Sequence, residues 1–515
     1  MKAFDNGKKS LGGIIPNFAP VKTAFVMTLR PCFAIFGISL LLAACGQPVR
    51  RSAGECLSSV ETSAKSTTVL SQSGPVAGYI DDGVYIYKGI PYARAGRFQL
   101  PESPEPWADV RASRAYGPTC PQDKRMGWYD DNQAFAMHWD DGFPDEDCLR
   151  VNVWTSDIRA DAKMPVMVWL HGGGFRAGSG QELISYDGSN LARSHGVVVV
   201  TLNHRLNALG FLDLSAYGAR YALTGNLGML DIVKALEWVR DNISAFGGDP
   251  SNVTVFGQSG GGGKVSTLMA MPSARGLFSK AIVQSGSITS LLSPKYSRRI
   301  GTYTVDALGI VPSRIEEIEK VPYDKLLAAY NGALARVREE AKADGELPEN
   351  ILDQILFGQT PVVDGVVIPF QPSTPEALAI SREVPVIIGT VYNEFTPNME
   401  DPIFKPLAFR QVADRIAAGC APVYHYIFNW ASPVLDGAFG STHCLEIPFV
   451  FDNVLLHRTF TGGAEDAIQL GHRVSALWTS FARNGVPSAA GIPTWVPAQK
   501  GILQIDIEST ILNNN

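Results

Sequence analysis

The chain has 515 residues, of which 44 are basic and 50 acidic, so its formal net charge is −6 at pH 7. This balance provides neither the basic surface that nucleic-acid binding requires nor a long acidic tail. Hydrophobic residues make up 45% of the chain, which is typical of a globular protein, and we find no internal repeat.

Residues 1–44 predict a signal peptide. Lys22 and Arg30 precede an apolar run, residues 32–44, that is too short for a membrane span and suits a signal sequence. The run ends in Leu42-Ala43-Ala44-Cys45, which resembles the lipobox of bacterial lipoproteins and predicts cleavage before Cys45 and acylation of its thiol. The alternative is an ordinary cleaved signal, which would leave the protein periplasmic or secreted. Translation starts at Met1 or at Met27, and the sequence leaves both open.

The residues around the predicted lipid site indicate where the chain resides. Gly46, rather than aspartate, follows the cysteine, which by analogy with enterobacterial sorting indicates the outer membrane, with the enzyme facing the periplasm. Residues 45–73 are rich in Ser and Thr and predict a flexible tether, so we expect the folded domain to span residues 74–515. Export would make the cysteines candidates for disulfides. Beyond Cys32 and Cys45 the chain has five: Cys56, Cys120, Cys148, Cys420 and Cys444. Because five is an odd number, at least one stays unpaired.

The body of the chain alternates apolar strands with helical patterns. Near-continuous apolar runs such as residues 165–170 are typical of strands buried on both faces. Their alternation with helices predicts an α/β fold with a mostly parallel central sheet and helices on both faces. The predicted elements are a hairpin at 78–80 and 84–87, strands at 149–154, 165–170, 197–202, 252–256, 280–285, 384–389, 423–428 and 502–505, and helices at 228–243, 264–271 and 409–418.

Two glycine-rich turns follow predicted strands, at the edge of the sheet where ligands bind. Strand 252–256 runs into Gly257-Gln258-Ser259-Gly260-Gly261, the G-x-S-x-G pattern of a nucleophile elbow. Strand 165–170 runs into His171-Gly172-Gly173-Gly174, whose backbone N–H groups can face a developing oxyanion together with the N–H of Gly260. The alternative is a pair of glycine-rich loops with an idle serine.

A serine nucleophile needs a base, and the base needs an acid that orients it. Among eight histidines, His443 is the candidate because it lies in a loop after strand 423–428. Glu394 follows strand 384–389 and lies between serine and histidine in the chain, as the orienting acid should. The competing carboxylates are Glu400, Asp401 and Asp436.

Several longer motifs resemble those of the type-B carboxylesterases, the cholinesterase/carboxylesterase family of the α/β-hydrolase fold, from about residue 74 to the end. They are residues 87–93 (YKGIPYA), 146–153 (EDCLRVNV), 171–175 (HGGGF), 225–231 (GNLGMLD), 246–250 (FGGDP), the elbow, and 443–451 (HCLEIPFVF). The resemblance implies catalysis by Ser259, Glu394 and His443 and an oxyanion hole formed by Gly173, Gly174 and Gly260. It also implies a disulfide between Cys120 and Cys148. No metal ion or organic cofactor is required.

The resemblance implies a serine hydrolase that cleaves small-molecule carboxylic esters through an acyl-enzyme intermediate. Gln258 replaces a glutamate that many members carry, and Gly260 replaces alanine. Without that carboxylate, neutral alkyl or aryl esters are better expected substrates than choline esters. The alternatives are a catalytically inactive adhesion or binding module of the same family, which would lack the serine, and a lipase, which would carry an apolar lid. The sequence leaves the oligomeric state open.

His443 follows Glu394 by only 49 positions, fewer than is typical of the family. This interval has room for one helix, 409–418, so part of the usual cover over the site is expected to be missing. We therefore expect a shallow site that accepts bulky esters.

Overall fold

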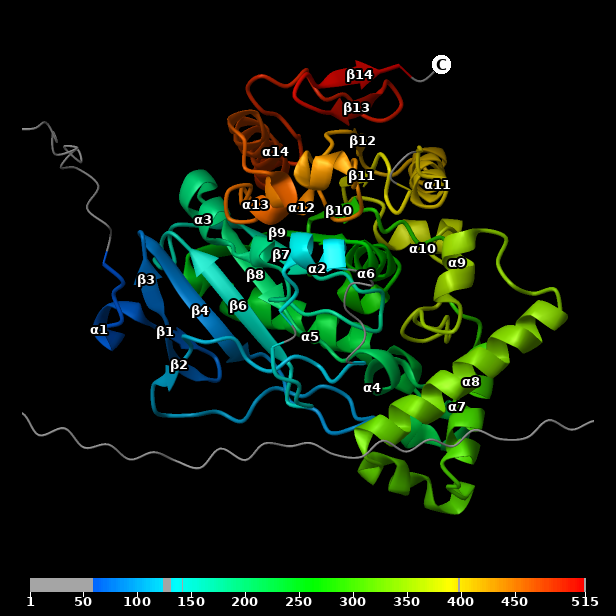
Figure 1. Ribbon diagram of the computed structural model, residues 1–515. Coiled ribbons are helices and arrows are strands. Elements are labelled where there is room, and N and C mark those ends of the chain that lie inside the picture. Colours follow the sequence, from blue (N-terminus) through cyan, green and yellow to red (C-terminus); the bar gives the residue numbers. More distant parts are fainter. Residues whose placement is uncertain (1–58, 124–130, 141, 397–398, 514–515) are drawn as a thin grey trace, which may run out of the picture. The chain divides into compact units, whose positions relative to one another are not determined.

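The computed structural model describes residues 59–513 apart from 124–130, 141 and 397–398. The predicted signal peptide, Cys45 and Cys56 lie outside the described residues. An eleven-stranded sheet organises the fold (Figure 1), with the strand order β14-β13-β12-β11-β10-β9-β7-β8-β6-β4-β3. Its strands are β3 (Tyr79–Asp81), β4 (Val84–Pro91), β6 (Arg150–Thr155), β7 (Met164–Leu170), β8 (Val198–Leu202), β9 (Gly248–Gln258), β10 (Lys280–Gln284), β11 (Val386–Val391), β12 (Val423–Phe428), β13 (Ile502–Ile505) and β14 (Thr510–Leu512).

The strands from β8 to β13 pair in parallel, and antiparallel pairs close the sheet at both edges. Parallel pairing brings the carboxyl ends of β7, β9 and β11 to one edge of the sheet, which is where the glycine turns and Glu394 follow them.

Alternate residues of the buried strands enter two hydrophobic cores on opposite faces of the sheet. In β7, Val166 and Val168 join one core, whereas Met167 and Trp169 join the other. Successive side chains of a strand point to opposite faces, so an all-apolar strand needs cover on both. This arrangement confirms the predicted α/β class with helices on both faces.

Helices cover both faces of the sheet. The first core packs against α4 (Asn207–Phe211), α5 (Leu227–Asn242), α6 (Gly260–Leu268), α7 (Pro294–Ala307), α8 (Tyr323–Ala343) and α11 (Phe404–Ala417). The second packs against α2 (Asp131–Met137), α3 (Ser189–His195), α12 (Ile447–Val450), α13 (Arg458–Thr461) and α14 (Glu465–Asn484). The short helices α9 (Ile351–Leu356) and α10 (Pro375–Ile380) lie between α8 and β11 in the chain.

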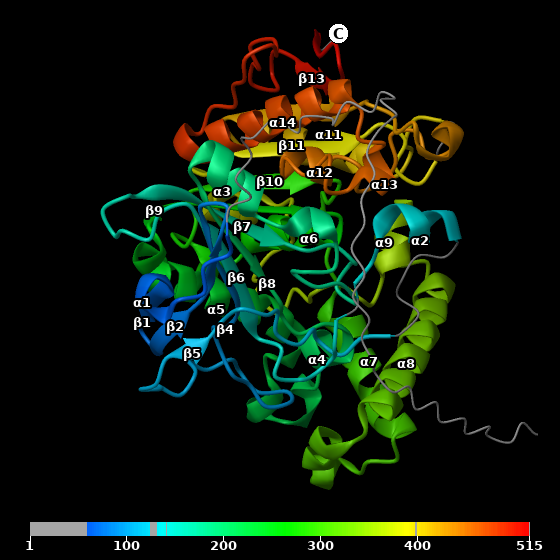
Figure 2. The ribbon, with the colours of Figure 1, turned by 60° about the vertical axis from the view of Figure 1, so that its left-hand side comes forward.

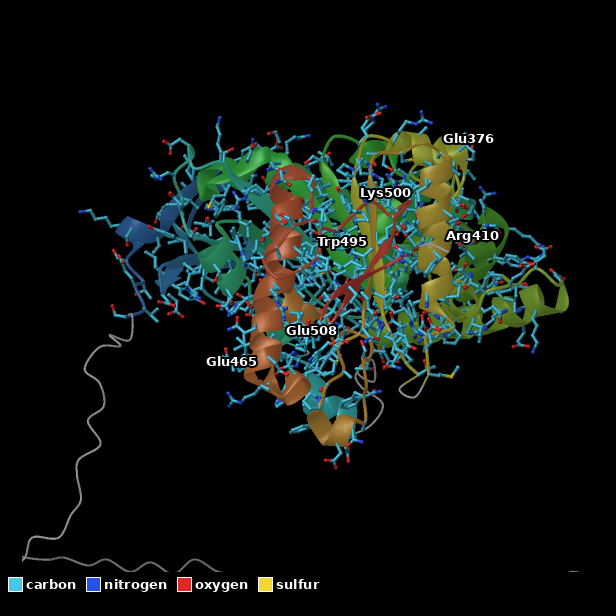
Figure 3. The ribbon with its side chains drawn as sticks, turned by 90° about the horizontal axis from the view of Figure 1, so that it is seen from above. Glu376, Arg410, Glu465, Trp495, Lys500 and Glu508 are labelled. Carbon is cyan, nitrogen blue, oxygen red and sulfur yellow. The ribbon has the colours of Figure 1, made fainter. Side chains whose placement is uncertain are left out.

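The helices of the C-terminal half lie on opposite sides of the last strands. Figure 3 shows α14, which begins at Glu465, and α11, which carries Arg410, on either side of β13. Figure 2 shows α14 near α3, and the ring of His195 lies 2.9 Å from Ser475 Oγ across this contact. None of the described helices is both long and apolar enough to cross a membrane.

The predicted tether extends too far toward the C-terminus. Helix α1 (Ala64–Thr67) and strand β1 (Thr68–Ser71) lie within it, and β1 joins β2 (Gly74–Ala77) and β5 (Arg111–Ala112) in a second, three-stranded sheet. The Ser- and Thr-rich composition concealed an alternating pattern in which Val69 packs into the first core. Ordered structure therefore begins before residue 74.

The expected disulfide between Cys120 and Cys148 is not formed. Both side chains are buried as free thiols, and the two thiols are hydrogen-bonded to each other. Cys120 Sγ also accepts a hydrogen bond from the N–H of Leu206 (3.2 Å). The hydrogen bond between Cys148 and Cys120, and then burial, raise the pKa of the Cys148 thiol well above its usual value. The pairing implied by the family motif thus correctly places the two residues side by side, but hydrogen bonds satisfy them without oxidation.

Candidate active site

Ser259 connects β9 to α6 in a strained turn. Its φ of 57° and ψ of −125° lie outside the regions that L-residues favour. Its N–H donates to the carbonyl of Gln284 on β10 (2.8 Å). The Gln284 side chain in turn accepts a hydrogen bond from Trp478 Nε1 on α14 (3.1 Å). The turn is therefore fixed by the neighbouring strand, which is itself tied to α14.

Gly260 allows the glycine loop to approach the elbow closely. A Cβ at this position would lie 2.2 Å from the carbonyl oxygen of Gly174, a distance that side chains do not tolerate. The alanine that many family members carry would therefore force the loop away in this chain. This contact gives a physical reason for the glycine that follows the serine.

The loop after β7 presents unpaired backbone donors at the same place. Gly173 and Gly174 have φ values of 76° and 64°, in the left-handed region that favours glycine. The carbonyl of Gly173 accepts the N–H groups of Arg176 and Ala177 (3.3 and 3.1 Å), which closes the turn. Among the described residues, the N–H groups of Gly173, Gly174 and Gly260 have no backbone partner. Three free donors thus gather beside Ser259.

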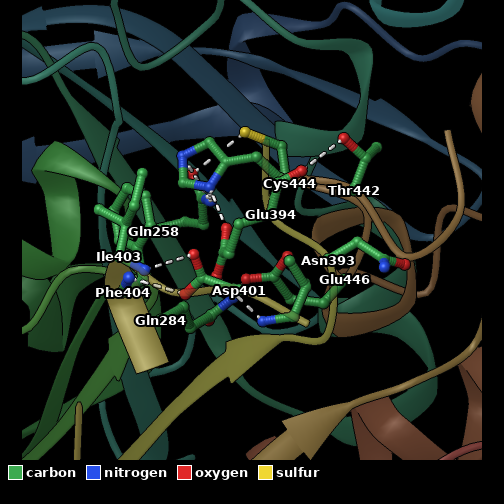
Figure 4. Close-up of polar contacts among 12 residues, drawn as sticks. Gln258, Gln284, Asn393, Glu394, Asp401, Ile403, Phe404, Thr442, Cys444 and Glu446 are labelled. Carbon is green, nitrogen blue, oxygen red and sulfur yellow. Dashed lines mark hydrogen bonds and ion pairs between the residues drawn. The ribbon is translucent and has the colours of Figure 1, made fainter. Parts of the chain in front are cut away.

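Glu394 and His443 form a buried pair at the end of β11. Figure 4 shows Glu394 with Gln258 and Glu446 around it. The His443 ring donates from Nδ1 to Glu394 Oε2, and the other carboxylate oxygen accepts the N–H of Val391 (3.1 Å). The N–H of His443 donates to the Glu394 carbonyl (3.0 Å), which fixes one backbone against the other. Glu394 is fully buried and His443 is 6% exposed. With Nδ1 engaged, Nε2 keeps its lone pair and is able to accept a proton.

The expected contact between serine and histidine is not formed. Within the described part of the chain, Ser259 Oγ has no hydrogen bond, and Gln258 Nε2 lies 3.2 Å from His443 Nε2 instead. The Cys444 thiol donates to Gln258 Oε1 (3.2 Å), so the amide nitrogen faces the ring. Catalytic contacts are often loose without substrate. In the sequence, Gln258 is recognisable only as a lost charge, and its contact with the base depends on the fold.

The three competing carboxylates do not contact the His443 ring. Asp401 accepts the N–H groups of residues 403, 404 and 405 at 2.9, 2.7 and 2.6 Å and so caps the start of α11. Glu400 pairs with Lys405, and Asp436 is exposed. Of the four candidate carboxylates, Glu394 is therefore the one that contacts the His443 ring.

A second buried carboxyl group lies beside this pair. Glu446 is fully buried, and its Oε1 accepts a hydrogen bond from Gln284 Nε2 (3.2 Å). Burial, and then the charge of Glu394, raise the pKa of Glu446 to about 7. The ring centroids of Phe395 and Phe404 lie 4.4 and 5.1 Å from the centroid of the His443 ring. The motif at residues 443–451 contains Glu446, but only the structure places it next to Glu394.

This geometry defines a class of protein. A strained serine, free backbone donors and a histidine–glutamate pair meet at the carboxyl ends of parallel strands, as in serine hydrolases of the α/β-hydrolase fold. The model of the carboxylesterase family matches residues 65–406 and 398–515.

Relatives and solved structures agree with this class. The chain is 36% identical to a para-nitrobenzyl esterase of Bacillus subtilis, over 87% of this chain and 96% of the relative. It is 31% identical to a phenmedipham hydrolase of Pseudarthrobacter oxydans, over 82% and 91%. A solved Clostridium hathewayi esterase, described as hydrolysing aliphatic aromatic polyesters, superposes with a TM-score of 0.77 at 34% identity, over 87% of this chain and 95% of that one. The chain belongs to the carboxylesterase family and is a carboxylic ester hydrolase.

Proposed function

We propose that the protein hydrolyses esters by acyl transfer through Ser259, with His443 as the base and Glu394 as the acid that orients it. The observation that carries this assignment is the buried Glu394–His443 pair, which lies against Gln258, the residue preceding the serine. His443 Nε2 removes the Ser259 proton as Oγ attacks the ester carbonyl, and the ring then protonates the leaving alcohol. Water releases the acyl group by the same route.

The free N–H groups of Gly173, Gly174 and Gly260 stabilise the tetrahedral intermediate. Each such donor lowers the barrier by about 3–4 kcal/mol when it faces the developing oxyanion. Glu394 keeps the imidazole in the tautomer with a free Nε2 and stabilises the imidazolium that forms.

The substrate class that we infer is neutral alkyl or aryl esters. Gln258, which contacts the base, carries no charge where many family members have glutamate, so the site lacks that attraction for a cationic choline group. Support for bulky substrates comes from the open surroundings of the site: Ser259, Gly173 and Gly174 are partly exposed, and Phe395 beside the base is 54% exposed. The descriptions of two similar proteins name para-nitrobenzyl and aliphatic aromatic groups, which agrees with an aryl or alkyl ester as substrate.

The serine assignment is tested by hydrolysis of p-nitrophenyl butyrate. We expect the wild type to turn over this ester, whereas Ser259→Ala should lose almost all activity and keep its melting temperature. If both proteins were inert and the wild type bound a protein ligand, the result would favour the alternative function of an adhesion module. Normal activity in Ser259→Ala would refute the assignment.

The substrate class is tested with two ester series. We expect kcat/KM to vary little as the acyl or alcohol group grows, and butyrylcholine to be a poorer substrate than an uncharged ester of the same size. A sharp loss beyond acetyl or propionyl esters would show that other segments, such as residues 131–139, enclose the site.

A further inference from the structure

A charged side chain lies fully buried behind the glycine loop. Lys264 belongs to α6, and its Nζ donates to the carbonyl oxygens of His171 (2.8 Å) and Gly172 (3.4 Å). The ring of Phe175 lies 6.0 Å from the ammonium group. Burying an ammonium group is costly, and an apolar side chain of the same length would fill the space without that cost. Packing alone therefore does not explain a lysine here.

A carboxylate and two histidines surround Lys264, and the carboxylate only partly offsets the effect of burial on its charge. The carboxylate of Glu182 acts on it electrostatically, and two buried histidines, His171 and His204, stack at 5.0 Å nearby. Burial, together with the charge of Lys264, holds the pKa of both histidines well below the usual value, so both rings are neutral at neutral pH. The positive charge behind the loop thus belongs to Lys264.

Both contacts of Lys264 fall on peptide groups of the glycine loop. The Gly172 carbonyl belongs to the same planar peptide as the N–H of Gly173, the proposed oxyanion donor. This carbonyl also lies 3.0 Å from His171 Nδ1, which donates to it in the neutral ring. Donors that converge on a carbonyl polarise its peptide group and strengthen the N–H on the other side. The polarisation is effective because the surroundings are dry.

We propose that Lys264 is a positioning residue for ester hydrolysis, whose buried ammonium group holds and polarises the Gly172–Gly173 peptide from behind and so strengthens the Gly173 N–H as an oxyanion donor. The inference rests on the proposed role of Gly173. Lys264 touches no reacting atom and acts through the peptide. Its effect therefore belongs to the transition state, where the oxyanion exists, and not to substrate binding.

Two variants separate this role from packing. Lys264→Met keeps the length of the side chain and removes its charge and donors. Thr267→Val is the matched control, because Thr267 is fully buried on the same helix and, among the residues that the structure describes, its hydroxyl bonds only to the Gly263 carbonyl (2.8 Å). With p-nitrophenyl butyrate we expect Lys264→Met to lower kcat about 10-fold with KM within about 2-fold. Thr267→Val should change neither.

A trifluoromethyl ketone reports on the oxyanion hole directly, because the serine adds to it and leaves an anionic oxygen in the hole. We expect Lys264→Met to weaken its binding by the same factor as kcat/KM, and to leave binding of the matching methyl ketone unchanged. Burial lowers the pKa of Lys264 to about 7. The wild-type kcat should therefore decline as pH rises through about 7, and this decline should be absent in Lys264→Met.

Three results would overturn the inference: an unchanged kcat in a folded Lys264→Met, an equal loss in Thr267→Val, or a kcat loss without weaker trifluoromethyl ketone binding. If Lys264→Met fails to fold, the pH dependence of trifluoromethyl ketone affinity in the wild type decides, because constant affinity between pH 6 and 9 would refute the role. The proposed function fails separately, through activity in Ser259→Ala.

Discussion

The contact between Glu394 and His443 makes a sharp prediction at the scale of a single residue. Glu394→Gln keeps the shape of the side chain but removes the charge that holds the Nδ1–H tautomer and stabilises the imidazolium. We expect kcat for p-nitrophenyl butyrate to fall about 10³- to 10⁴-fold, with the melting temperature nearly unchanged.

Glu400→Gln is the control for this variant, because Glu400 is a nearby carboxylate whose partner is Lys405 rather than the base. It should retain normal turnover. Near-normal activity in Glu394→Gln would mean that another carboxylate orients His443.

Glu446 predicts how stability depends on pH. Its pKa is raised from 4.5 to about 7 by burial and by Glu394. Between pH 4.5 and about 7, Glu446 therefore keeps its proton in the folded state and releases it in the unfolded state. The contribution of Glu446 to the free energy of unfolding is complete below about pH 4.5 and is lost as pH rises through about 7. The free energy of unfolding of Glu446→Gln, relative to that of the wild type, should rise by on the order of 3 kcal/mol from pH 4.5 to pH 8.

Urea unfolding at pH 4.5 and pH 8 measures this difference. Glutamine suits the site because its oxygen can still accept the hydrogen bond from Gln284. Parallel pH profiles for the two proteins would contradict the prediction.

At the scale of secondary structure, a buried ion pair fixes α5 to the turn after β8. Arg205 donates from Nε and Nη2 to the two oxygens of Asp231 (2.8 and 2.7 Å), and both side chains are at most 5% exposed. Asp231→Asn should lower the free energy of unfolding by about 3–5 kcal/mol, because it leaves the guanidinium group buried without its counter-charge.

Two comparisons check this reading by urea unfolding. The double variant Arg205→Met/Asp231→Leu should recover much of the loss. Asp157→Asn, which breaks a pair whose arginine is 72% exposed, should cost less than about 1 kcal/mol. Equal costs for Asp231→Asn and Asp157→Asn would refute the reading.

Most strands could be predicted from the sequence because they are buried on both faces and therefore uniformly apolar. The predicted ranges 423–428 and 502–505 agree with β12 and β13. Strand β9 instead begins at Gly248, where pairing with Met164 on β7 outweighs the poor strand propensity of the segment. None of the predicted helices lies between residues 285 and 384, although α8 buries Leu326 and Tyr330 at helical spacing.

The site was predictable to the extent that motifs carry it. Ser259, Glu394 and His443 each follow a strand, so chain order and turn chemistry are enough to propose them as the catalytic residues. Lys264 and the orientation of Gln258 could not be predicted, because they depend on side-chain contacts with segments 93 and 185 positions away. The predicted disulfide was wrong for a similar reason. The motif identifies Cys120 and Cys148 as neighbours but does not determine their oxidation state.

At the scale of the whole molecule, the lipobox-like Leu42-Ala43-Ala44-Cys45 predicts a membrane-attached enzyme. The wild type should sediment with the outer-membrane fraction and partition into detergent, whereas Cys45→Ser should be soluble or retained as precursor. Esterase activity and an antibody against the chain measure both fractions. A soluble wild type whose mature N-terminus is not Cys45 would contradict the prediction.

The hydrogen bonds that connect Ser259 through Gln284 to Trp478 affect when the enzyme becomes active during its synthesis. Gln284 and Trp478 are 194 positions apart, so the strand that fixes the nucleophile's turn acquires its last side-chain partner only when nearly the whole chain has been made. During vectorial synthesis or export, the nucleophile emerges long before its base and before the helix that secures its turn. The nascent chain is therefore expected to be inert toward esters, and fragments that end before α14 should show no fractional activity, so hydrolysis begins only after α14 has been made.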